Sequence, residues 1–245
     1  MTKIKNYISG LFRNFGYEIQ RHSSASKNIK EPFYHFRDLI KVNQPVIFDV
    51  GAYIGNTVEQ FKSCFPESWI HAFEPFDESF AIMKNRFQKT DRVLLNNIAI
   101  GDSFAESDSF YVTENEGSSS LLKPRKSANK FWKGTPLLMQ KKVKVKLNTI
   151  DKYCDEKNIS KIDILKVDVQ GNEIKVLKGA SRMLGEKNIK LIFTEISIAP
   201  NYRDQSEIDE VISLLRSHGY RIFNFFKMKH AMGKLIECDV LFYSE

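Results

Sequence analysis

The chain has 245 residues, of which 42% are hydrophobic, and it carries a formal net charge of +7. A chain of this length can bury a substantial core, and it fits one large domain with appendages better than two equal domains. Its three cysteines are far apart and form no Cys-x-x-Cys pair, so neither a disulfide framework nor a thiolate zinc site is indicated.

The positive charge is concentrated in two segments. Residues 1–30 hold six Lys or Arg and one acid, and residues 123–146 hold nine Lys or Arg and no acid. These segments carry +5 and +9, so the rest of the chain carries −7 to give the total of +7. The basic character therefore belongs to two appendages and not to the presumed catalytic core.

Residues 1–44 are predicted to form a helical N-terminal extension. An amphipathic helix is expected at residues 4–15, and a second helix at residues 31–40 has Pro32 in its first turn. The apolar face of the first helix fits contact with its own domain or a homodimer partner, or peripheral contact with the inner face of a membrane. Because no signal-like apolar run begins the chain, we expect a cytoplasmic protein.

From residue 45 to residue 245, short β-rich runs alternate with helical patterns. The expected strands lie at residues 46–50, 69–73, 93–100, 162–167, 191–196, 220–226 and 239–244. Helical spacing of apolar residues separates them, and one such helix carries Ile174, Leu177 and Leu184. This order predicts a doubly wound α/β fold, with a mostly parallel seven-stranded sheet covered on both faces.

The last two predicted strands are joined by an expected loop, Lys227 to Glu237. The loop is too short to contain a crossover helix, so the sheet should end in an antiparallel strand.

Residues 107–147 interrupt the alternation and form an expected insertion. Val143, Val145 and Leu147 alternate with lysines, which predicts a strand with one apolar face. The basic segment within the insertion could clamp an anionic acceptor such as a nucleotide-sugar or an acidic glycan. An ordinary solvated surface is the alternative.

A glycine turn follows the first predicted strand. Asp49 lies near the end of the strand, Gly51 follows the strand, and Gly55 precedes a helix that begins with Asn56 and Thr57. Here a ligand can approach the backbone and the free N–H groups of the helix.

The turn does not match a dinucleotide-binding sequence. The G-x-G-x-x-G pattern requires a glycine where Tyr53 stands. The bulk of Tyr53 argues against a pyrophosphate lying on this turn.

Glu74 ends the second predicted strand, about 20 residues beyond the glycine turn, where an acid can accept hydrogen bonds from both hydroxyls of an adenosine ribose. Pro75 and Phe76 could form a wall for the adenine, and Asn97 and Ala99 are expected near the base because of their position in the third strand. The glycine turn and Glu74 together predict binding of an adenosine without phosphates.

Seven short motifs make the chain similar to one enzyme family. In chain order they are FDVGAYIGN, HAFEP, NNIAIGD, GSSSLL, LNTID, IDILKVDVQGNEIKVLKGA and LIFTEI. Over about residues 45–243 this series resembles FkbM-type methyltransferases. The resemblance implies a class I, Rossmann-like methyltransferase fold and S-adenosyl-L-methionine as methyl donor. It also implies an oxygen acceptor, often a sugar hydroxyl of a polysaccharide, nodulation factor, glycolipid or secondary metabolite.

Many members carry Glu where Gln170 stands, which argues against a role that needs a carboxylate there.

The chemistry of methyl transfer to oxygen needs a group that removes the hydroxyl proton. Asp168 and Glu195 lie at the ends of the fourth and fifth predicted strands, so both should face the cleft beside the donor. Either could act as base, or the two could share a divalent cation such as magnesium. Helix capping by Asp168 and an ion pair at Glu195 are the structural alternatives. His230, in the expected loop, is a further candidate base.

Three functions are compatible with these features. The first is an O-methyltransferase that acts on a sugar or a glycan-related small molecule. The second is an RNA ribose methyltransferase, suggested by the basic insertion with Phe131 and Trp132. A nucleic-acid partner is the less expected, because DVQG stands where amino-methylating base enzymes carry D/N-P-P-Y/F. The third is a non-catalytic module that binds adenosine.

Overall fold

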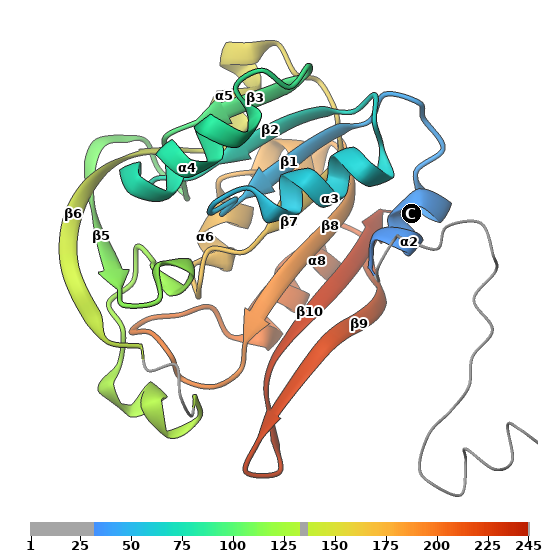
Figure 1. The fold of residues 1–245 in the computed structure, drawn as a ribbon. Helices are drawn as coiled ribbons and strands as arrows, with labels where there is room; N and C mark the ends of the chain where they lie inside the picture. The colour runs from blue at the N-terminus through green and yellow to red at the C-terminus, as the bar shows by residue number, and fades with distance from the viewer. Residues whose placement is uncertain (1–31, 133–136, 245) are drawn as a thin grey trace, which may run out of the picture. The chain divides into compact units, whose positions relative to one another are not determined.

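The computed structural model describes residues 32–132 and 137–244 (Figure 1). The amphipathic helix expected at residues 4–15 lies outside the described residues. A compact unit extends from Glu31 to Glu245. Within the described part of this unit, no helix is long and apolar enough to cross a membrane.

A seven-stranded sheet forms the centre of the unit, in the order β3-β2-β1-β7-β8-β10-β9. Its strands are β1 (Val46–Val50), β2 (Trp69–Phe73), β3 (Val93–Asn96), β7 (Ile162–Val167), β8 (Ile189–Ser197), β9 (Tyr220–Ala231) and β10 (Lys234–Ser244). The pairs β3–β2, β2–β1, β1–β7 and β7–β8 are parallel, whereas β10 is antiparallel to both β8 and β9. The predicted fold class is therefore confirmed.

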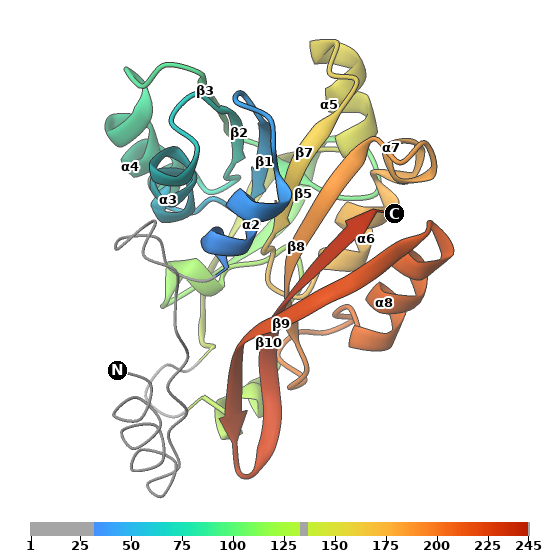
Figure 2. The same ribbon diagram turned by 90° about the vertical axis from the view of Figure 1, so that its right-hand side faces the viewer.

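Helices cover both faces of this sheet (Figure 2). They are α2 (Phe33–Leu39), α3 (Asn56–Cys64) and α4 (Asp77–Phe87) on one face, and α5 (Ile150–Lys157), α6 (Glu173–Lys178), α7 (Ser181–Gly185) and α8 (Ile208–Ser217) on the other. Because both faces are covered, the β7 run IDILKV is buried along its whole length.

Helix α2 is packed into this unit by aromatic contacts. The fully buried ring of Phe36 lies 5.8 Å from that of Phe61 in α3 and 5.3 Å from that of Phe193 in β8, measured between centroids. The helix therefore helps to cover the sheet.

The insertion forms a second sheet in the order β4-β6-β5. Its strands are β4 (Ala99–Ile100), β5 (Ala105–Thr113) and β6 (Met139–Asn148). Val145 and Leu147 are buried, and Lys144 and Lys146, which alternate with them, are exposed, as the alternation predicts. The single strand expected at residues 93–100 is wrong, because β3 ends at Asn96 and β4 pairs with β6 of the other sheet.

Two further expectations needed correction. Residues Lys227 to Glu237 are not a loop: β9 and β10 continue to a tight turn at Met232 and Gly233, which both have left-handed backbone conformations (φ 52° and 73°). The helix expected to carry Ile174 and Leu184 is two helices, α6 and α7, separated at Gly179 and Ala180.

Replacing Phe36 with Ala should test whether α2 belongs to the folded core. Loss of a buried aromatic ring usually costs about 3–5 kcal/mol, so the free energy of unfolding in urea should fall by about that amount. Phe104→Ala is the matched control, because the Phe104 side chain is 52% exposed. Equal small losses in both variants would contradict the packing of α2.

Candidate active site

The glycine turn after β1 uses its backbone amides internally. Gly51 N and Ala52 N donate to the carbonyl oxygen of Phe73 at 3.1 and 2.9 Å, and Tyr53 N donates to Glu74 Oε2 at 2.9 Å. These three amides are therefore not free to cradle a phosphate, in agreement with the expectation from Tyr53.

Close packing explains why glycine stands at both Gly51 and Gly55. A Cβ on Gly51, at φ +79°, would lie 1.8 Å from the backbone oxygen of Asp168, so glycine allows the turns after β1 and β7 to meet. A Cβ on Gly55, at φ +86°, would lie 2.4 Å from the ring of Phe87 in α4.

A cavity of about 220 Å³ opens beside this turn, between the ends of β1, β2 and β7 and the second sheet. Its polar lining residues include Tyr53, Asn56, Thr57, Glu74 and Glu116. Its apolar lining residues include Pro75, Ile98, Ile100, Phe110 and Leu121. The cavity thus offers both polar and apolar contacts, as the binding of a nucleoside requires.

Glu74 is held in the wall with capacity to accept further hydrogen bonds. Its Oε2 accepts from Tyr53 N and its Oε1 from Phe76 N, both at 2.9 Å. Since each carboxylate oxygen can accept about two hydrogen bonds, both oxygens can still accept one. Burial raises the pKa of Glu74 to about 7, although the two amides oppose this rise.

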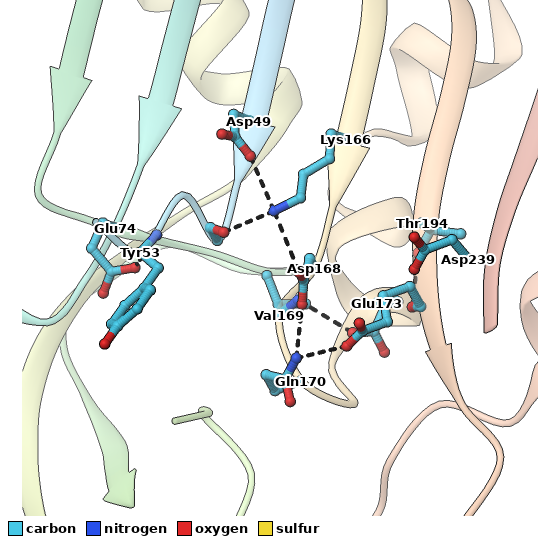
Figure 3. Close-up of polar contacts among 12 residues, drawn as sticks. Asp49, Tyr53, Glu74, Lys166, Asp168, Val169, Gln170, Glu173, Thr194 and Asp239 are labelled. Atoms are coloured by element: carbon cyan, nitrogen blue, oxygen red, sulfur yellow. Dashed lines mark hydrogen bonds and ion pairs between the residues drawn. The ribbon is translucent and has the colours of Figure 1, made fainter. Parts of the chain in front are cut away.

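A buried ammonium group lies between the ends of β1 and β7 (Figure 3). Lys166 Nζ is 3.1 Å from Asp49 Oδ1 and 3.6 Å from Asp168 Oδ2, and it donates to the carbonyl oxygen of Gly51 at 2.8 Å. Burial alone would lower the pKa of Lys166, but the two carboxylates outweigh burial and raise it above its ordinary value. The lysine is therefore charged and fixes the position of Asp168.

A second cavity, of about 290 Å³, adjoins the first, and we call it the acid cleft. Its lining residues are Asn115, Gly117, Ser118, Trp132, Leu137, Asp168, Gln170, Glu195, Asn201, Lys229 and Glu237. Gly117, Asp168 and Gln170 also line the first cavity, so the two cavities meet at these residues.

Gln170 connects the two central carboxylates of the acid cleft. Its Nε2 donates to Asp168 Oδ1 and to Glu195 Oε1, each at 2.8 Å, and its Oε1 is within 3.2 Å of the hydroxyl of Tyr202. Burial, together with the charges of Asp168 and Glu237, raises the pKa of Glu195 well above its ordinary value. Glu195 thus has the raised basicity expected of a proton acceptor.

The sequence of residues 49–222 matches the model of the methyltransferase FkbM domain. The chain belongs to the FkbM methyltransferase family. It is accordingly an S-adenosylmethionine-dependent methyltransferase.

A curated relative and two solved structures are similar to this FkbM methyltransferase. The 2-O-methyltransferase NoeI of Sinorhizobium fredii is 25% identical over 91% of each chain. A crystal structure of the methyltransferase FkbM from Methylobacillus flagellatus KT matches with a TM-score of 0.54 and 16% identity, over 88% of this chain and 48% of that one. The chain therefore spans about half the length of that protein. An rRNA methylase from Streptococcus thermophilus matches with a TM-score of 0.50 and 9% identity, over 91% of this chain and 99% of that one. These two structural likenesses concern the fold alone.

Most of the residues predicted for the donor line the first cavity of the FkbM methyltransferase. They are Gly51, Tyr53, Asn56, Thr57, Glu74, Pro75, Ala99 and Asp168. The other four predicted donor residues do not line this cavity. Asp49 is paired with Lys166, and Gly55 packs against α4. Phe76 packs in the core of the second sheet, and Asn97 Nδ2 donates to the carbonyl oxygens of Glu74 and Pro75 at 3.1 and 3.2 Å.

The candidate catalytic residues are only partly brought together. Asp168 and Glu195 meet through Gln170, as their positions at the strand ends suggest. His230 lies in β9, opposite Leu235, with an exposed side chain, and it is the neighbouring Lys229 that lines the acid cleft.

The structure gives no support for the magnesium ion expected at Asp168 and Glu195. Among residues 32–132 and 137–244, no group of three or more His, Cys, Asp or Glu could hold a metal ion. Asp168 and Glu195 are instead connected by the Gln170 amide, which donates to both carboxylates.

Sequence reasoning missed several residues of the site. Lys166, Ile98, Phe110 and Glu116 line the first cavity but were not singled out from the sequence. Lys166 alone carried a detectable signal, because a lysine inside an apolar strand needs a buried partner. The other three reach the cavity because the second sheet folds over the first.

The stability of the protein should fall as pH rises, through Glu173. This buried residue accepts from Gly171 N and Val169 N, and burial raises its pKa from an ordinary 4.5 to about 7. Between about pH 4.5 and 7 the folded chain holds a proton that the unfolded chain has lost, so raising the pH across this window removes stability. Urea unfolding of wild type and Glu173→Gln at pH 5 and pH 8 measures the effect. The pH-dependent loss should be smaller in the variant, and an equal loss would contradict the assignment.

Proposed function

We propose that this methyltransferase transfers the methyl group to a hydroxyl of a sugar or of a glycan-related small molecule. The observation that carries the proposal is the meeting of the donor cavity with a polar acid cleft at Asp168 and Gln170. The cleft presents carboxylates, amides and one ammonium group, which together can accept from and donate to several hydroxyls of a polyol. The relative named as a 2-O-methyltransferase supports oxygen as the acceptor atom.

The residues of the first cavity fit an adenosine. Glu74 has two free acceptor positions for the ribose hydroxyls, and Pro75, Ile98 and Phe110 offer an apolar wall for the base. S-Adenosylmethionine, when bound, supplies a methyl group on a positively charged sulfonium. Asp168 lies where the cavities meet, so its carboxylate favours positive charge at that point.

Glu195 is the proposed proton acceptor. Its Oε1 accepts from Gln170, whereas its Oε2 has no hydrogen-bond partner in the part of the chain that the structure describes. With S-adenosylmethionine bound, the acceptor oxygen would bond to the methyl carbon while the methyl–sulfur bond breaks and leaves its electron pair on sulfur, and the hydroxyl proton would pass to the Glu195 carboxylate. Gln170 orients this carboxylate and that of Asp168 toward the junction of the two cavities.

Incubation with isotopically labelled S-adenosylmethionine tests the proposed acceptor class. Separate pools of oligosaccharides, nucleotide-sugars and RNA should show label in a sugar-containing pool, with a mass increase of one methylene. Glu195→Gln should lower the transfer rate about 10²–10⁴-fold, the usual contribution of a general base, while donor binding is kept. Label in RNA alone would overturn the proposal, and donor binding without any transfer would favour a non-catalytic adenosine-binding module.

Glu74→Ala should weaken donor binding at least about a hundredfold, because two hydrogen bonds to an ionised carboxylate are lost. Wild-type affinity should also fall as pH drops through about 7, because protonated Glu74 accepts hydroxyl hydrogens poorly, and this dependence should be smaller in the variant. Calorimetry at pH 6 and pH 8 measures both effects. Glu114→Ala removes the same charge from an exposed position and serves as the control. Unchanged affinity in Glu74→Ala would refute the ribose assignment.

A further inference from the structure

A basic groove of about 710 Å³ lies beside the acid cleft. Its cations are Lys123, Arg125, Lys126 and Arg203, and its described lining contains no acid. Leu137, Leu138 and Met139 form an apolar wall along the groove. Leu138 and Met139 are 42% and 49% exposed, so this wall is open to a ligand.

Backbone hydrogen bonds fix the cations of the groove. Residues 123–125 run antiparallel to residues 201–203, with Arg125 N donating to the Asn201 carbonyl at 2.8 Å and Arg203 N to the Lys123 carbonyl at 2.9 Å. Arg125 Nε also donates to the carbonyl oxygen of Tyr202 at 2.7 Å. The backbones of two distant segments and the side chain of Arg125 are therefore held along one groove before any ligand binds.

The groove continues from the acid cleft. Leu137 lines both, and Asn201, two residues before Arg203, lines the cleft. Between them, the hydroxyl of buried Tyr202 donates to the Ser118 carbonyl at 2.6 Å and approaches Gln170. The order is thus donor cavity, acid cleft and basic groove.

The other lysines of the basic insertion have different surroundings. Lys141 pairs with Glu78 at 2.5 Å, and Lys142 lies over the ring of Tyr111 at 5.4 Å. Lys144 is exposed on the same strand, β6, outside the lining of the groove. Of the described cations, Lys123, Arg125 and Lys126 therefore line the groove, whereas Lys141, Lys142 and Lys144 of β6 lie outside its lining.

We propose that the basic groove binds the phosphate or pyrophosphate group of a phosphorylated sugar whose hydroxyl-bearing ring occupies the acid cleft. This inference rests on the proposed function and specifies its acceptor. Carboxylates repel an anion from the cleft and the four cations attract it to the groove, so such an acceptor has one favoured orientation. Arg125 and Arg203 suit phosphate oxygens geometrically, and the apolar wall can contact the group beyond the phosphate.

Binding of inorganic pyrophosphate, followed by calorimetry and by ³¹P NMR, tests the groove directly and needs no methyl transfer. The double variant Lys126→Gln with Arg203→Gln removes one cation from each of the two segments. Lys142→Gln with Lys144→Gln removes the same charge from β6 and is the matched control. The groove variant should bind pyrophosphate at least about tenfold more weakly than wild type, and the β6 variant should bind within about twofold of it. Equal weakening in both variants, or no binding by wild type, would overturn the proposal.

Methyl transfer then identifies the kind of phosphorylated sugar. Three acceptors are compared: a uridine diphosphate sugar, a prenyl phosphate sugar and a neutral methyl glycoside. Transfer to each is measured with wild type and with both double variants. A rise in KM for either phosphorylated sugar in the groove variant alone, with donor affinity unchanged, supports the proposal. Transfer to the neutral glycoside as efficient as to both phosphorylated sugars overturns it but leaves the proposed function intact. A short RNA that binds the wild type, and binds both double variants equally weakly, would indicate a nucleic-acid surface and would also overturn the proposal.

Discussion

The buried ammonium of Lys166 is the interaction on which the geometry of the site depends. A fully buried carboxylate such as Asp49 is costly unless a charge or hydrogen bonds compensate it. Lys166 compensates Asp49 across the β1–β7 pair, where the two residues are direct neighbours in register. The same ammonium binds the Gly51 carbonyl and approaches Asp168. One cation therefore links the donor turn to the carboxylate at the junction of the two cavities.

The antiparallel strand β10 determines the electrostatics on the acceptor side. It lies between β8 and β9, which places Asp239 directly opposite Glu195 and brings Glu237 into the acid cleft. Lys227 pairs with Asp239 at 2.8 Å, and Lys229 pairs with Glu237, so cations of β9 partly offset these acids. Burial, together with the remaining negative charge, keeps the pKa of Glu195 high. A parallel strand at this position would present a different set of residues to the cleft.

Eight of the twelve residues predicted for the donor line the first cavity, whereas fewer features of the acceptor side could be predicted. Gly51 and Glu74 could be identified because strands of a parallel sheet end at one edge, and each residue follows directly from its own strand. His230 was misplaced because the hairpin continues through residues that a polarity pattern assigns to a loop. Helix α5 was not predicted, although Thr149 accepts from Lys152 N as an N-cap. The insertion was recognised as a strand pattern, yet its position over the donor cavity depends on β4 pairing with β6, which no local pattern reveals.

The separation of charge between cleft and groove suits the reaction that we propose for the site. Burial and nearby negative charge together raise the pKa of Glu195, the proposed proton acceptor, and the same negative charge disfavours an anionic acceptor at that point. The two requirements are compatible if the anionic group is bound at a distance from the reacting hydroxyl, by cations that do not neutralise Glu195. The hydrogen bonds between residues 123–125 and 201–203 hold Arg125 and Arg203 in such a position, outside the lining of the acid cleft. Backbone pairing between segments about 80 residues apart thus keeps the cations of the groove away from the carboxylates of the acid cleft. The composition of the chain shows only the net charge and not this separation.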